Sequence, residues 1–206
     1  MGSCDDADDP PPSTQGAVRR IRTPRLLLRG WTDGDRVPFA RLNADPEVMA
    51  HFPAPLTRAQ SDAFVDRIGE HFERHGFGAW AVELRSTGEL IGFTGLSVPR
   101  FRSDWMDQRE QPVVEVGWRL ARPAWGQGYA TEAARSVLDL AFDELGRREV
   151  VSFTVVGNRR SRAVMERLGM RELAHYDHPI PDGPSLPSIA YLVDAARYRE
   201  QRTRGG

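Results

Sequence analysis

The chain has 206 residues, of which 40% are hydrophobic and 28% charged, and its formal net charge at pH 7 is -1. These values are typical of a soluble globular protein of one domain, and they argue against the basic composition of nucleic-acid-binding proteins. The sequence contains no apolar run near the roughly 20 residues of a membrane-spanning helix, and no secretory leader. We therefore expect a cytoplasmic protein with no membrane or nucleic-acid partner.

The basic residues exclude two classes of enzyme. All 28 are arginine, a bias typical of GC-rich bacterial genes. P-loop proteins bind phosphate with a lysine, and Schiff-base enzymes need a lysine amine, so both classes are excluded. Cys4 is the single cysteine, and His175 and His178 have no third ligand nearby in the sequence, so no metal site is predicted.

The first 17 residues contain four aspartates and three consecutive prolines, which predicts a disordered acidic arm. No linker or internal repeat interrupts residues 18–198. We expect these residues to form one mixed α/β domain, followed by a short tail of residues 199–206.

The predicted elements of the first half begin with a strand and two helices. Residues 23–31 form the strand, a short helix follows the Thr32 and Asp33 cap signal, and a second helix follows Thr57. Residues 77–98 predict a hairpin with a Ser-Thr-Gly turn, and residues 113–120 predict a strand. The intervening loop holds Asp104, Trp105, Met106, Asp107 and Glu110, a composition suited either to an amine or basic-peptide acceptor or to a loose surface loop.

The second half alternates between helices and strands. Apolar residues at helical spacing follow residue 128 and stop at Gly146, and residues 149–156 form a nearly continuous apolar strand. A further helix follows Asn158 and ends at Gly169, and residues 187–194 predict a late strand.

The stretch RPAWGQGYATEA, at residues 122–133, places two glycines between a strand and a helix. Such a loop offers free backbone N–H groups at the positive end of the helix and is typical of anion sites. A dinucleotide-binding loop would have a third glycine where this chain has Thr131. The pyrophosphate of coenzyme A and a purely structural glycine turn both remain open.

The same stretch resembles the acyl-CoA loop of the GNAT N-acetyltransferase superfamily, in particular its RimJ/RimL-type branch. Members of that branch acetylate protein N-terminal amines or small-molecule amines. The segments TPRLLLRGWTDGD, NADPEVMAHFPAPLT, GELIGFTGL, VEVGWRL and NRRSRAVMERLGMRE follow in the branch's order and spacing, so the resemblance runs from Thr23 to Tyr191. It implies a single-domain α/β (α+β) fold, with a mixed central sheet splayed in the middle and flanked by helices.

The resemblance also implies acetyl-CoA as co-substrate and a set of residues that bind it. Main-chain amides from Gln127 to Thr131 would surround the diphosphate, and backbone groups of the 113–120 strand would pair with the pantetheine arm. Asn158 would either bind that arm or cap its helix, and Arg122 would either meet phosphate or stay solvated. The implied cofactor-binding residues are Val116, Gly117, Trp118, Leu120, Arg122, Gly126, Gln127, Gly128, Tyr129, Ala130, Thr131, Asn158 and Ser161.

Two residues are candidates for the chemistry. The place of Glu115 in VEVGW resembles a general-base position, although a surface-facing strand glutamate is the alternative, and Ser161 fits the branch pattern for a proton relay or a coenzyme contact. The general-acid tyrosine of many superfamily members is replaced by Met165. Arg159, Arg160 and Arg162 would reach the 3′-phosphate or form a solvated face.

The predicted function is acetyl transfer to a primary amine, above all a protein or peptide N-terminal α-amino group. A small-molecule acceptor such as an antibiotic or polyamine, and a non-catalytic acyl-CoA sensor, are the alternatives. The sequence leaves open whether the protein forms a homodimer.

Overall fold

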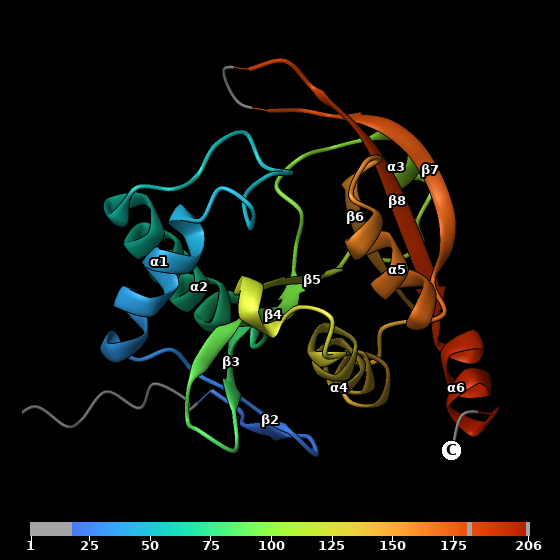
Figure 1. Ribbon diagram of the computed structural model, residues 1–206. Coiled ribbons are helices and arrows are strands. Elements are labelled where there is room, and N and C mark those ends of the chain that lie inside the picture. The colour runs from blue at the N-terminus through green and yellow to red at the C-terminus, as the bar shows by residue number, and fades with distance from the viewer. Residues whose placement is uncertain (1–17, 181–182, 205–206) are drawn as a thin grey trace, which may run out of the picture.

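A computed structural model describes residues 18–180 and 183–204, so the predicted acidic arm lies outside the described residues. Strands and helices follow one another along the chain, often two of a kind in succession (Figure 1). The strands are β1 (Ile21–Arg22), β2 (Leu26–Arg29), β3 (Ala79–Leu84), β4 (Leu90–Ser97), β5 (Glu115–Leu120), β6 (Glu149–Val155), β7 (Arg171–His178) and β8 (Leu186–Asp194). The helices are α1 (Arg36–Ala44), α2 (Arg58–His75), α3 (Asp104–Asp107), α4 (Tyr129–Asp143), α5 (Arg159–Arg167) and α6 (Ala195–Arg204).

The strands form one mixed sheet in the order β1-β2-β3-β4-β5-β6-β8-β7. Neighbouring strands are antiparallel except β5 and β6, which run parallel and share one paired position, Glu115 with Val151. β5 is paired with β4 along its whole length, and β6 is paired with β8 along its whole length. β5 and β6 therefore part beyond Glu115, which confirms the predicted splayed sheet.

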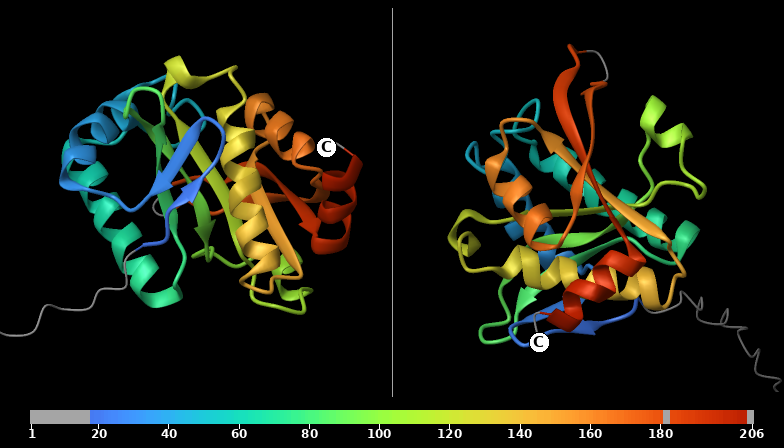
Figure 2. Two further views of the ribbon diagram at one scale, coloured as in Figure 1. Left: turned by 90° about the horizontal axis from the view of Figure 1, so that it is seen from below. Right: turned by 90° about the vertical axis from the view of Figure 1, so that its right-hand side faces the viewer.

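Helices cover both faces of the sheet. Figure 2 (left) shows α1 and α2 gathered on one side and α4, α5 and α6 on the other. Phe93 of β4 packs into a cluster with Phe39 of α1, whereas Val116 of β5 packs into the main core with Val137 of α4. Because neighbouring strand residues point to opposite faces, β4 contributes side chains to both clusters, Phe93 to the first and Leu96 to the main core.

Local signals in the sequence explain the helix boundaries. Thr57 and Gln60 form a capping box at the start of α2, in which each side chain accepts a hydrogen bond from the other residue's backbone N–H. Gly76, with φ 73°, ends that helix. Asn158 caps α5 by accepting from the backbone N–H of Ser161, as one of its two predicted roles required.

The segment after the β3–β4 hairpin differs from its prediction. Residues 104–107 form helix α3, and the side chains of Trp105 and Met106 are buried in a cluster with Val151 and Leu192. Trp105 and Met106 therefore do not present an acceptor surface, and the segment is not a loose loop. The two large apolar side chains gain more from burial against the sheet than from solvent.

The C-terminal end of the described chain is helical. α6 runs from Ala195 to Arg204, so the expected domain boundary at residue 198 falls inside this helix. Tyr198 is buried, and its hydroxyl donates to Asp139 of α4. Within the described ranges, no helix has the length and apolar character needed to cross a membrane.

Candidate active site

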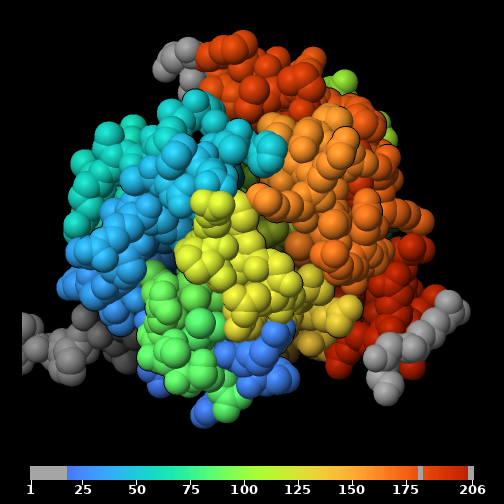
Figure 3. Space-filling model, in the orientation of Figure 1, coloured from blue at the N-terminus to red at the C-terminus, as the bar shows by residue number. Residues whose placement is uncertain are grey.

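The gap between β5 and β6 opens into a cavity of about 1880 Å³. Figure 3 shows the surface hollowed where the α1–α2 loop, the glycine loop and α5 meet. A site for one small ligand is typically 300–1,000 Å³, so this cavity has room for two substrates. The predicted site residues that line it are Glu115, Gly117, Trp118, Leu120, Gly126, Gly128, Tyr129, Ala130, Thr131, Asn158 and Ser161.

The glycine loop presents a row of free backbone donors. Gly126 and Gly128 have φ of 74° and 80°, a left-handed conformation that glycine adopts without strain, and α4 begins at Tyr129. In the described part of the chain, no protein group accepts a hydrogen bond from the backbone N–H groups of residues 126–131. These donors lie at the positive end of a 15-residue helix, so the loop has the geometry of an anion site.

Residues of the β1–β2 turn hold this loop in place as a brace. Glu132, in the first turn of α4, accepts from the Thr23 hydroxyl at 2.6 Å and from the Arg25 side chain at 2.6 Å. Arg25 also donates to the carbonyl of Gln127 at 2.8 Å and stacks over the Tyr129 ring. These bonds favour the ionised Glu132 and hold its pKa below the usual value, although burial opposes the shift. The brace fixes the start of α4 relative to the sheet.

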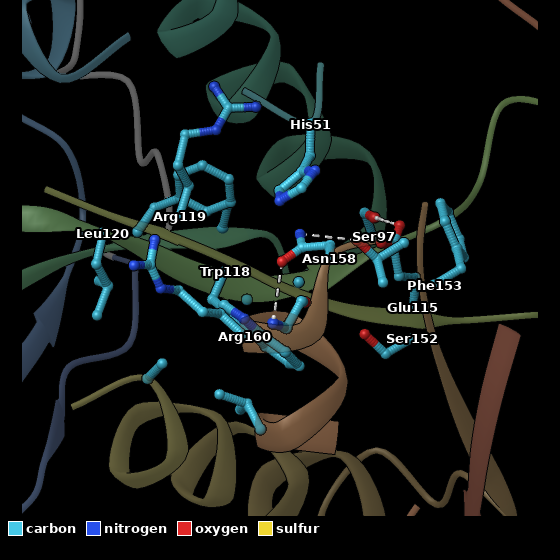
Figure 4. A pocket seen from close by; sticks show the side chains of 18 of the residues that line it. His51, Ser97, Glu115, Trp118, Arg119, Leu120, Ser152, Phe153, Asn158 and Arg160 are labelled. Atoms are coloured by element: carbon cyan, nitrogen blue, oxygen red, sulfur yellow. Dashed lines mark hydrogen bonds between the residues drawn. The ribbon is translucent and has the colours of Figure 1, made fainter. Parts of the chain in front are cut away.

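Glu115 lies where β5 and β6 part. Its half-buried carboxyl accepts a hydrogen bond from the Ser97 hydroxyl at 3.1 Å (Figure 4). Burial raises the pKa of Glu115 to about 8, and the Ser97 bond partly offsets this by favouring the ionised form. A carboxyl with a pKa near the working pH is suited to accept a proton, so the alternative of an ordinary surface glutamate does not describe this position.

Asn158 and Ser161 line the opposite wall. Both polar atoms of the Asn158 side chain are engaged: its carbonyl oxygen accepts from Ser161, and its amide donates to the Thr154 hydroxyl at 3.0 Å. The Ser161 hydroxyl lines the cavity and, among the described residues, has no hydrogen-bond partner. Ser161 is therefore the freer of the two side chains to meet a ligand.

The remaining predicted residues are placed as follows. Val116 is fully buried beneath α4, and Trp118 is half-buried against the same core. Met165, at the position of the family tyrosine, is also fully buried. Arg122 forms an ion pair with Glu47 and does not line the cavity. The side chain of Gln127 donates to the carbonyl of Pro123, away from the row of free amides.

The three arginines of α5 have different surroundings. Arg162 donates to Glu172 and to the Tyr191 hydroxyl, so it belongs to the α5–β7–β8 packing. Arg160 lies over the Trp125 ring, 4.5 Å from its centroid, and lines the cavity. Arg159 also lines the cavity, and both Arg159 and Arg160 are exposed. Of the three, Arg160 is the one that stacks on Trp125, which directly precedes Gly126.

Sequence reasoning missed Ser97, Arg25 and Arg119. No local pattern marks the contacts of the first two, because each bonds a residue distant in the sequence. Arg119 follows Glu115 and Gly117 at strand spacing on one face of β5, so the period of two could have placed it in the same cavity.

Comparison with known proteins agrees with this geometry. A family model described as Acetyltransferase (GNAT) domain matches residues 25–171. FsC-acetyl coenzyme A-N(2)-transacetylase of Aspergillus fumigatus is 34% identical over 181 residues, 84% of this chain and 75% of that protein. The putative ribosomal N-acetyltransferase YdaF of Bacillus subtilis is 41% identical over 59 residues, 29% of this chain and 32% of its own.

A solved acetyltransferase structure from Agrobacterium tumefaciens superposes with a TM-score of 0.68 at 26% identity, covering 86% of this chain and 95% of that one. The predicted fold and the predicted superfamily are both confirmed. Because the family model spans most of the described domain, the chain belongs to the GNAT acetyltransferase family, whose enzymes use acetyl-CoA as acyl donor.

Proposed function

We propose that this enzyme transfers the acetyl group of acetyl-CoA directly to a primary amine, and that the amine is the N-terminal α-amino group of a protein or peptide. One observation carries the proposal: a row of free backbone N–H groups adjoins a cleft between parted strands, with Glu115 at the bottom of that cleft. Donors of this kind suit a diphosphate, and a cleft between strands suits an extended chain.

The donor substrate would occupy both parts of this site. The amides of residues 127–131 would hold the diphosphate, the Thr131 hydroxyl would add a bond, and Arg160 would supply positive charge at the mouth. The pantetheine arm would lie along β5, against backbone groups of Val116, Gly117, Trp118 and Leu120. Arg122 has no part in this arrangement, because it lies outside the cavity and pairs with Glu47.

The reaction needs two proton movements and no covalent enzyme intermediate. The amine must lose a proton, the new C–N bond replaces the C–S bond of the thioester, and the departing thiolate takes up a proton. Glu115 would accept the first proton, directly or through a water molecule, and the hydroxyl of Ser161 would relay the second, taking up a proton from solvent water as it gives its own to the thiolate. Aligning the two substrates in the cleft lowers the barrier further, because it removes much of the entropy cost of their encounter.

The acceptor distinguishes two versions of this function. The similarity to the ribosomal N-acetyltransferase covers a short stretch and, by its name, favours a ribosomal acceptor over a small molecule. The longer similarity to the FsC transacetylase, whose name specifies transfer to an N(2) nitrogen, favours a small-molecule amine as the second candidate.

An acceptor screen tests the proposal. Free thiol would be measured with acetyl-CoA alone and with two panels: peptides with free or acetylated N-termini, and free amines that include polyamines and aminoglycosides. We expect thiol release with free-N-terminal peptides and none with their acetylated counterparts. Turnover confined to the free amines would replace the peptide acceptor by the second candidate, and tight CoA binding without turnover on either panel would contradict the enzymatic role of Glu115.

A further inference from the structure

Arg119 places a positive charge in the cavity. It lies on the same face of β5 as Glu115 and Gly117, and it lines the cavity. Its Nη1 donates to the Asn43 side chain at 2.7 Å, while its Nε is buried without a hydrogen-bond partner. Among the described residues, no carboxylate forms an ion pair with it. Burial lowers the pKa of Arg119 to about 10, which reflects a charge that the protein itself does not neutralise.

Arg29, another arginine with a poorly exposed side chain, provides a comparison. Its side chain is 12% exposed, and it donates to both Asp35 and Glu83 at 2.7 to 2.9 Å. A charge removed from water is costly unless it is paired, so Arg29 follows the ordinary rule and Arg119 departs from it. An arginine that lines a cavity and has no acidic partner among the described residues is suited to bind an anionic ligand.

The surroundings hold this guanidinium in one orientation. Asn43 of α1 is fully buried and donates in turn to the Ser61 hydroxyl of α2 at 2.9 Å, and Ser61 is also fully buried. The guanidinium lies 4.1 Å from the Phe52 ring centroid and 5.7 Å from that of Phe93. Aromatic faces attract a cation but do not neutralise it. The relay and the rings fix the donor geometry and leave the charge available.

We propose that Arg119 binds a carboxylate of the acceptor, so that the enzyme acts on primary amines that carry an acidic group at a fixed distance. This inference rests on the proposed function, because Glu115 marks the position of the reacting amine. A strand rises about 3.3 Å per residue, so Arg119 lies about 7 Å from Gly117 and about 13 Å from Glu115 along β5. The reacting amine lies between these two positions, so the acidic group lies roughly two to four extended residues from the amine.

This spacing excludes the carboxylate of a single α-amino acid, which lies too close to its own amine. Two sources have the required chemistry: a peptide with an acidic residue near its N-terminus, and a small ω-amino acid. A phosphate of the acyl donor does not fit. The Arg119 side chain bonds Asn43 of α1, whereas the glycine loop leads into α4, which packs on the other face of β5 with Val116 and Leu120.

Matched acceptor pairs test the proposal. The peptide pair is Ser-Ala-Asp-amide and Ser-Ala-Asn-amide, and the small pair is 6-aminohexanoate and 6-aminohexanamide. We expect the wild-type enzyme to favour the carboxylate by about tenfold or more in kcat/KM, mainly through KM, in the pair that represents the natural source. Arg119→Gln should abolish the preference, and Arg119→Lys should reduce it because lysine cannot bind a carboxylate in a bidentate way.

Arg67→Gln is the matched control. Arg67 also lines the cavity and lies over Phe64, but its side chain is exposed, so its loss changes the net charge equally and should leave the preference intact. Thermal melts confirm that each variant is folded. Equal kcat/KM within both pairs for the wild type, or a preference that survives Arg119→Gln, overturns the proposal.

A binding measurement separates this proposal from the proposed function. N-acetyl-6-aminohexanoate and its amide have no free amine, so ligand-observed NMR with the CoA-saturated protein reports the subsite without any turnover. One outcome is that no amine is acetylated, while the wild type binds the carboxylate more tightly than the amide and Arg119→Gln binds them equally. In that case the proposed function fails and the subsite stands. Equal binding of the carboxylate and the amide by the wild type, or binding unchanged by Arg119→Gln, overturns the subsite even if acetyl transfer is found.

Discussion

The pH dependence of turnover should depend on one hydrogen bond, from Ser97 to Glu115. With a pKa of about 8, Glu115 is about one tenth ionised at pH 7 and about nine tenths ionised at pH 9. If its ionised form accepts the proton of the amine, kcat/KM rises about tenfold over that interval. The α-amino group of a peptide also titrates near pH 8, so this limb alone does not identify Glu115.

Ser97→Ala distinguishes the two groups. The Ser97 hydroxyl donates to the carboxylate at 3.1 Å and favours its ionised form, so removing it raises the pKa of Glu115 and leaves the amine unchanged. A hydrogen bond to a charged group contributes about 1.5–3 kcal/mol, and 1.36 kcal/mol corresponds to one pKa unit. The midpoint should therefore move from about 8 to about 9 or above, and kcat/KM at pH 7 should fall about tenfold.

The assay is thiol release from pH 6 to 10 with the best acceptor of the screen, under conditions in which the rate reports kcat/KM. Ser152→Ala is the control, because Ser152 lines the same cavity from β6 without a hydrogen bond to Glu115, and its midpoint should match that of the wild type. Glu115→Gln should lower turnover across the whole range with little change in CoA affinity. A Ser97→Ala midpoint equal to that of the wild type would refute the assignment of this limb to Glu115.

Two further predictions concern the glycine loop and the buried ion pairs. Gly128→Val forces a branched side chain into a left-handed backbone position and should raise the Kd for CoA, measured by calorimetry, about tenfold or more. Gly88→Val is the control: it is equally strained, at φ 73°, but lies far from the glycine loop, so it should leave this Kd unchanged. Equal effects of the two substitutions on the Kd would contradict the site. Asp35→Ala should lower the free energy of unfolding in urea at pH 7 by about 3 kcal/mol, because it leaves Arg29 with one buried partner, whereas Asp33→Ala, at a 98% exposed side chain, should change it by less than about 0.5 kcal/mol. Burial opposes ionisation of Asp35, but the hydrogen bonds that it accepts from Arg29 and Thr32 outweigh burial and hold its pKa below the usual 3.8. The stability that its charge provides is therefore present above pH 3.8, and the loss of unfolding free energy caused by Asp35→Ala should shrink as the pH falls below that value. A loss that stays constant down to about pH 2 would contradict an electrostatic origin.

Local patterns in the sequence predicted the parts of the site that local chemistry determines. The capping signal at Thr57 and the spacing of apolar residues after it define α2. The paired glycines before a periodic apolar segment define the loop at the start of α4, and Asn158 defines the start of α5. In each case the determining groups lie within a few residues of one another, so the chain sequence alone carries the signal.

The parts that escaped prediction depend on distant contacts or on edge positions. The brace between Arg25 and Glu132 joins residues 107 positions apart, so no local sequence pattern near either residue predicts this contact. β7 lies at the edge of the sheet, is largely polar and pairs with β8 alone, so it lacks the apolar pattern of a buried strand. The composition around Trp105 and Met106 led us to expect either an acceptor surface or a loose surface loop, although burial of such large apolar groups is the commoner outcome.

The separation of β5 from β6 leaves two unpaired strand edges in the interior of the molecule. Unpaired edges can take up any extended chain, including a strand of a second copy, which is a route to aggregation. A bound acyl donor that fills the gap would block this route as well as supply the acetyl group. Light scattering during mild heating should therefore develop more slowly in a CoA-saturated sample than in a CoA-free sample, by a larger factor than the change in Tm alone accounts for.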